Sequence, residues 1–125
     1  MSDHVELEVD FTFEAAHRLP NVASDHKCAR LHGHSFRCSV AIAGPLDQDK
    51  GWVMDYADIK AAIEPLRLQL DHNYLNDIEG LENPTSEHVA RWVWLRLDPA
   101  LSGLKSVTVA ETCNARCTYR GDTHS

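Results

Sequence analysis

Two stretches of the chain alternate between apolar and polar residues, and each predicts a half-buried strand. In residues 5–17 the odd positions are apolar as far as Ala15, the even positions are mostly charged, and His17 continues the apolar parity. In a strand, successive side chains point to opposite faces of the sheet, which produces this period of two. The second stretch covers about 34–43, and its apolar face consists of Phe36, Cys38, Val40 and Ile42.

The middle of the chain changes to a helical period. Apolar residues in 55–70 recur at the spacing of an amphipathic helix, namely Ile59, Ala62, Ile63, Leu66 and Leu70. Pro65 lies inside this segment, so we expect a kink there or two shorter helices. A second helix is predicted over 84–97, with Pro84 in its first turn and Asn83 or Thr85 as its cap.

Alternation returns near the end of the chain and completes the predicted fold. Residues 104–112 form one expected strand and 116–120 a short last one, whereas 18–31 reads as an irregular loop. The element order is therefore ββααββ, which predicts an α+β fold with an antiparallel sheet and both helices on one face. A length of 125 residues fits a single domain, 1–125.

The charge balance limits the function. Asp and Glu total 19 against 12 Lys and Arg, for a net charge of −7. Non-specific binding to nucleic acid or to an anionic membrane requires a basic face, so neither partner is expected. The acidic start of the chain does not read as a signal peptide, and no apolar run is long enough to span a membrane. We therefore expect a cytoplasmic protein with reduced cysteines.

Three of the eight histidines have a spacing that suggests a metal site. His32 and His34 project to the same side of a strand, and His17 ends the preceding strand with matching parity. If the two strands pair antiparallel, the three imidazoles meet at one point, as in a catalytic zinc site with its fourth position open. The alternative is that the His-x-His pair consists of ordinary polar surface residues.

Cys28 lies four residues before His32, in the loop that would overhang such a metal. A thiol near cations can act as a base or nucleophile, and Lys27, Arg30 and Arg18 supply cations that also attract a phosphorylated ligand. Cys28 could instead be a fourth zinc ligand that closes a structural site, or an inert loop thiol. The sequence leaves all three open.

Two acidic residues complete the candidates. Asp71 and His72 follow the first helix, where a carboxylate can orient an imidazole, although polar residues at a helix end are also common. Glu111 shares the apolar parity of its strand, so it is either a salt-bridge partner or an anchor for a ligand with adjacent N–H donors. We interpret Cys113 and Cys117 as structural.

Taken together, these segments give the chain a specific resemblance to a known superfamily. The matching text is FTFEAAHRLP at 11–20, CARLHGH at 28–34, LDHNYLND at 70–77, ENPTSE at 82–87 and ETC at 111–113. The chain resembles the 6-pyruvoyl-tetrahydropterin synthase superfamily of the T-fold (tunnelling-fold) class over nearly its whole length. The Cys-x3-His-Gly-His spacing is similar to that of its bacterial branch, the 6-carboxy-5,6,7,8-tetrahydropterin synthases of queuosine biosynthesis.

The resemblance implies a role for each candidate residue. It implies Zn2+ held by His17, His32 and His34, and Cys28 as general base. It also implies that Asp71 and His72 relay protons and that Glu111 binds the pterin ring. It further implies trimers that stack into homohexamers, with active sites at the subunit interfaces.

The implied reaction converts 7,8-dihydroneopterin triphosphate to 6-carboxy-5,6,7,8-tetrahydropterin, acetaldehyde and triphosphate, which makes the protein a zinc-dependent carbon–carbon lyase. Two alternatives remain. Synthesis of the 6-pyruvoyl product uses the same first steps without carbon–carbon cleavage. A non-catalytic, zinc-stabilised oligomeric binding module predicts Cys28 as a fourth zinc ligand and no turnover.

Overall fold

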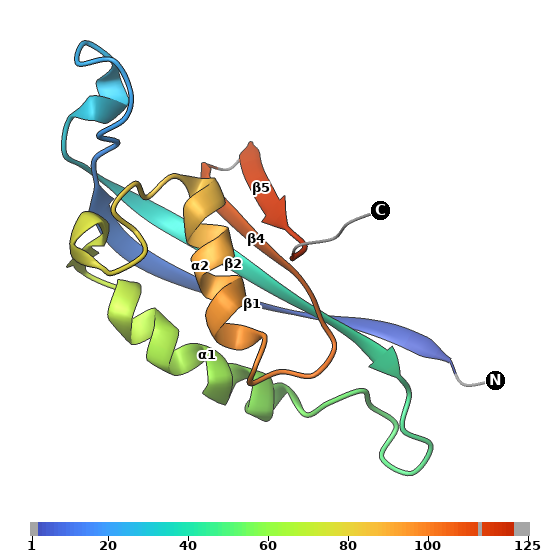
Figure 1. Ribbon diagram of the computed structural model, residues 1–125. Coiled ribbons are helices and arrows are strands. Elements are labelled where there is room, and N and C mark those ends of the chain that lie inside the picture. Colours follow the sequence, from blue (N-terminus) through green and yellow to red (C-terminus); the bar gives the residue numbers. More distant parts are fainter. Residues whose placement is uncertain (1–2, 113, 122–125) are drawn as a thin grey trace.

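A five-stranded sheet with two helices packed on one of its faces forms the molecule (Figure 1). The computed structural model describes residues 3–112 and 114–121. Across the sheet the strand order is β3-β1-β2-β4-β5. The strands are β1 (His4–His17), β2 (His32–Pro45), β3 (Asn73–Tyr74), β4 (Leu104–Thr112) and β5 (Ala115–Tyr119). The α+β class and the ββααββ order of the main elements are therefore confirmed.

The sheet differs from the prediction in one strand. β3 has two residues, follows the first helix and pairs parallel with Ala15 and Ala16 of β1, whereas the other described pairings are antiparallel. Two residues carry no measurable alternation, so the sequence pattern could not reveal this strand. β2 also begins at His32, two residues earlier than predicted.

Both predicted helices form, and each begins one or two residues later than predicted. α1 (Tyr56–Leu70) begins after Asp55, whose side chain accepts a hydrogen bond from the Ala57 N–H, and α2 (Ser86–Leu97) begins after Thr85, which caps the His88 N–H. Thr85 was one of the two predicted caps. The placement of Pro84 in the first turn was wrong, because that residue lies before the cap.

Of the two alternatives expected at Pro65, a kink or two shorter helices, the second is wrong, since α1 is one continuous helix. Proline removes one backbone N–H, which leaves the carbonyl of Ala61 without its helical donor. Pro65 and Ala61 are both exposed, so water can bond this carbonyl at little cost.

The core lies between the helices and the apolar face of the sheet. Phe13 and Phe36 are each 1% exposed and stack with ring centroids 4.9 Å apart, directly beneath the end of the β1–β2 ladder. Such an aromatic pair contributes ~0.5–1.5 kcal/mol beyond its buried area. This stack is a rigid support for the residues at the end of the ladder.

No helix in the described ranges is long and apolar enough to cross a membrane.

Candidate metal centre and active site

Antiparallel pairing of β1 and β2 brings the three histidines together. His17 and His32 are register partners at the last pair of the ladder, and His34 lies opposite Ala15. One ligand atom from each ring lies within 4.8 Å of the other two. The predicted convergence of His17, His32 and His34 is therefore present, and it results directly from strand register.

His17 is the deepest member of the cluster, with 1% of its surface exposed. Its Nδ1 lies 2.8 Å from the carbonyl of Pro84 and therefore donates to it, which leaves the lone pair on Nε2. Burial lowers the pKa of His17, so the ring is neutral at pH 7. Within the described residues this buried Nε2 has no hydrogen-bond partner. An orphaned buried lone pair is costly, and a metal ion would satisfy it.

The other two rings extend the same arrangement. His32 donates from Nδ1 to the carbonyl of Arg30 at 2.7 Å, so its Nε2 is also the free ligand atom. Phe36 contacts the rings of His17 and His34 edge-on, with centroids 5.3 and 5.8 Å away. Three imidazoles that converge beside Phe36, two of them oriented by backbone carbonyls, fit a divalent metal with an open fourth position.

Cys28 occupies a short 3-10 helix, η1 (Lys27–Ala29), in the loop between β1 and β2. Its thiol is half-buried, and its backbone N–H donates to Nδ1 of His26 at 3.0 Å. Figure 1 shows this loop projecting beyond the end of the β1–β2 ladder. Among the described residues, the converging ligand atoms come from the three histidines and not from Cys28.

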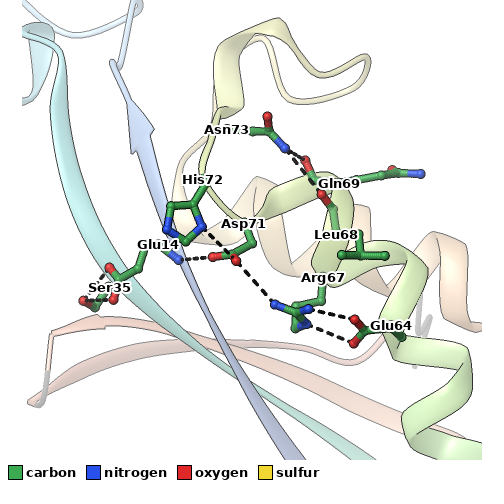
Figure 2. A network of polar contacts seen from close by, with 9 residues as sticks. All are labelled: Glu14, Ser35, Glu64, Arg67, Leu68, Gln69, Asp71, His72 and Asn73. Atoms are coloured by element: carbon green, nitrogen blue, oxygen red, sulfur yellow. Dashed lines mark hydrogen bonds and ion pairs between the residues drawn. The ribbon is translucent and has the colours of Figure 1, made fainter.

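Asp71 and His72 contact each other, and both are held against β1 (Figure 2). Asp71 Oδ1 accepts the backbone N–H of Glu14 at 2.9 Å, and Asp71 Oδ2 lies 2.9 Å from Nδ1 of His72. The backbone N–H of His72 in turn donates to the carbonyl of Glu14. The hydrogen bond from Glu14, helped by the one from His72, holds the pKa of the Asp71 carboxyl below its usual range.

His72 adopts a left-handed backbone conformation, with φ at 59°. This conformation is uncommon for residues other than glycine and is often found where a side chain has a functional position. The imidazole of His72 is 78% exposed, and it lines a pocket of about 500 Å³ together with His34 and Tyr74. Of the histidine cluster this pocket includes His34 alone, and of the predicted relay pair it includes His72 alone.

Glu111 faces α2, as its parity in β4 predicted. Its Oε1 accepts a hydrogen bond from the hydroxyl of Ser86 at 2.7 Å, and its Oε2 lies 3.8 Å from Nε2 of His34. The β4–β5 pairing shifts register between Ala110 and Thr112, next to this residue. The carboxylate is 26% exposed and adjoins the histidine cluster, so it could accept N–H donors from a ligand there.

Several residues that position the site were not predicted. Pro84 orients His17, Ser86 orients Glu111, and Asn76 bonds both the N–H and the carbonyl of Arg18. All three lie in the segments LDHNYLND and ENPTSE. The motif was thus visible in the sequence, but the partner of each group depends on contacts more than 20 residues away along the chain.

Three of the four cysteines lie in the described part of the chain, and Cys28, Cys38 and Cys117 are free thiols there. None of these three belongs to the converging ligand set. Burial raises the pKa of Cys38, which is fully buried in the core as predicted, and burial also raises the pKa of Cys117. Cys113 lies outside the described residues, so the interpretation of Cys113 and Cys117 as structural stays a prediction.

Fold and site together define an α+β protein of the T-fold class with a three-histidine candidate metal centre at the end of a strand ladder. The profile of the 6-pyruvoyl tetrahydropterin synthase family matches residues 6–122. The chain belongs to this family.

Individual relatives carry different names. The chain is 47% identical over 116 residues to the 6-carboxy-5,6,7,8-tetrahydropterin synthase of Synechocystis, covering 88% of each chain. It is 35% identical over 92 residues to the dihydroneopterin monophosphate aldolase of Pyrococcus furiosus, covering 74% of each. The structure of Caenorhabditis elegans 6-pyruvoyl tetrahydropterin synthase superposes with a TM-score of 0.88 at 30% identity, covering 96% of this chain and 97% of that one.

Proposed function

We propose that this protein is a zinc-dependent 6-carboxy-5,6,7,8-tetrahydropterin synthase of queuosine biosynthesis, acting in the cytoplasm. It converts 7,8-dihydroneopterin triphosphate and water to 6-carboxy-5,6,7,8-tetrahydropterin, acetaldehyde and triphosphate. The observation that carries the proposal is the convergence of His17, His32 and His34 in a chain 47% identical to the Synechocystis enzyme of that name.

The metal is held by the three histidines of the cluster. Bound there, zinc supplies a Lewis acid that polarises the side-chain hydroxyls of the substrate. The two Nδ1 hydrogen bonds of His17 and His32 fix both rings in the orientation that presents Nε2. The cluster therefore needs little rearrangement to bind an ion.

Cys28 acts as the general base. Its thiolate takes a proton from the first side-chain carbon, and the electron pair of that C–H bond moves into the pterin ring. The ring becomes tetrahydro and the carbon becomes a ketone, so the redox change is internal and needs no nicotinamide. Triphosphate leaves, the next carbon–carbon bond breaks to release acetaldehyde, and water supplies the second carboxylate oxygen.

The remaining residues move protons and hold the ring. His72 exchanges protons at Nε2, because its Nδ1 is occupied by the carboxylate of Asp71. Glu111 accepts the adjacent ring N–H and amino groups of the pterin through its two oxygens. Ser86 fixes the carboxylate before the ligand arrives, so part of the rate comes from positioning.

The protein assembles as trimers that stack into a homohexamer, with active sites at the subunit interfaces. Two features of the fold support this. β3 covers Ala15 and Ala16 on the outer edge of β1, and Asp71 and His72 bond the backbone of Glu14, so the part of that long edge before Glu14 offers backbone groups to another strand. The loop that carries Cys28 projects past the ladder end, where it can reach the cluster of a neighbouring copy (Figure 1).

Incubation of the zinc-loaded protein with 7,8-dihydroneopterin triphosphate, followed by mass analysis, tests the proposed reaction. The expected pterin carries a carboxyl group at C6. A 6-pyruvoyl product would replace the proposal with the reaction named for the Caenorhabditis elegans relative. Absence of turnover together with Cys28-ligated zinc would support the binding module instead.

A further inference from the structure

A chain of charged contacts runs from α1 to the relay pair, and its first two members have no part in the proposed reaction (Figure 2). Its members are, in order, Glu64, Arg67, Asp71 and His72. The carboxylate oxygen Oδ2 of Asp71 is the shared atom, since it accepts from Nη1 of Arg67 at 3.3 Å and lies 2.9 Å from Nδ1 of His72. Arg67 therefore touches the group that orients the imidazole, not the imidazole itself.

Glu64 fixes the guanidinium of Arg67. The contact is bidentate, with Nε to Oε2 at 2.9 Å and Nη2 to Oε1 at 2.7 Å. A planar guanidinium held by two parallel hydrogen bonds has a defined plane, so the direction of its remaining Nη1 donor is set. That donor is aimed at Asp71, one helical turn further along α1.

We propose that Arg67 is a positioning residue for His72. Arg67 holds Oδ2 of Asp71 at the place where this oxygen accepts the Nδ1–H of His72. The imidazole is thereby kept in the tautomer whose Nε2 lone pair is free. This inference rests on the proposed function for its catalytic consequence, although the tautomer is a property of the protein alone.

The need for a second anchor follows from the exposure of His72. The ring is 78% exposed, so water competes for its Nδ1–H, and the N–H of Glu14 holds the other oxygen of Asp71, Oδ1. A carboxylate held at one oxygen can rotate its second oxygen out of the plane that His72 requires. Contacts at both oxygens prevent this rotation, as outer residues do for metal-bound histidines.

The test compares Arg67→Leu with Lys60→Leu, which removes an exposed cation of the same helix outside the chain of contacts. Leucine is a good helix former, so both variants should fold. The first readout is the ¹⁵N spectrum of the histidine rings in the metal-free protein, with His72 assigned by its absence in His72→Gln. We expect a single Nδ1–H tautomer in the wild type and in Lys60→Leu, and a mixture in Arg67→Leu.

The second readout is steady-state kinetics of the zinc-loaded proteins. Arg67→Leu should lower kcat by about tenfold, part of the contribution of a general acid–base group, and leave KM within about twofold. If Arg67→Leu keeps the wild-type tautomer, the proposal is wrong, even if its melting temperature falls. If the wild type proves inactive, the proposed function fails, and the spectrum still decides the role of Arg67.

Discussion

His17 and His32 face each other at the final register pair of the β1–β2 ladder, with their ring centroids 4.5 Å apart. The last residue of β1 and the first residue of β2 therefore lie at the same point. His34 joins them because alternate residues of a strand share a face. A register shift of one residue would send the two strands' histidines to opposite faces, so the site depends on the ladder.

Zinc binding should require this convergence. His32→Ala removes one of three ligands, and we expect its affinity for zinc to fall by more than about 100-fold, because even outer partners of a ligand contribute 10–100-fold. His4→Ala, at the other end of β1, is the matched control and should keep one zinc per chain. Metal analysis after dialysis measures both. Full zinc content and activity in His32→Ala would show that the metal binds elsewhere.

Cys28 should be needed for turnover but not for metal binding. Because the converging ligands exclude it, Cys28→Ala should retain zinc while losing turnover by the ~10²–10⁴ typical of a general base. Cys117→Ala serves as a control for the loss of a half-buried thiol. Loss of zinc from Cys28→Ala, measured in the same preparation as the rate, would support the closed structural site.

Glu111 should contribute to ligand binding more than to stability. Glu111→Gln replaces one acceptor by a donor, which should weaken binding of neopterin by ~1.5–3 kcal/mol, as for hydrogen bonds to charged groups. The amide oxygen can still accept from Ser86, so the melting temperature should change little. Calorimetric titration measures the affinity. A variant that melts much earlier and binds neopterin normally would identify Glu111 as a structural partner of α2.

The stabilising effect of Asp71 should depend on pH. Its carboxyl pKa is lowered in the folded protein, chiefly by the Glu14 N–H, so the ionised form stabilises the fold above the unfolded value of about 3.9. This contribution is lost as the pH falls through the lower folded pKa. Urea unfolding should show Asp71→Asn less stable than the wild type at pH 7.

The same comparison at low pH provides the check. The wild-type carboxyl becomes protonated as the pH falls through its lowered pKa, and the difference between the two proteins should shrink there. A difference that stays constant from pH 7 down to the pH at which the wild type unfolds would mean that Asp71 stabilises the fold by its shape and neutral hydrogen bonds alone.

The sequence predicted the parts of this site that depend on local periodicity. Alternation placed His17 and His34 on the correct face, and α1 placed Asp71 at a helix end. It could not predict β3, because two residues show no period, and it could not decide whether Pro65 would divide the first helix. The hydrogen bond from His17 to the carbonyl of Pro84 could not be predicted either, because it joins residues 67 positions apart in the sequence.

Acetaldehyde release tests the central claim most directly. Zinc-loaded protein should release one acetaldehyde for each 7,8-dihydroneopterin triphosphate consumed, measured by coupled reduction of the aldehyde, because cleavage of the carbon–carbon bond produces one of each product. Cys28→Ala should release almost none over the same period. Consumption of the substrate without acetaldehyde would contradict the account, since it would mean that the side chain stays attached to the pterin.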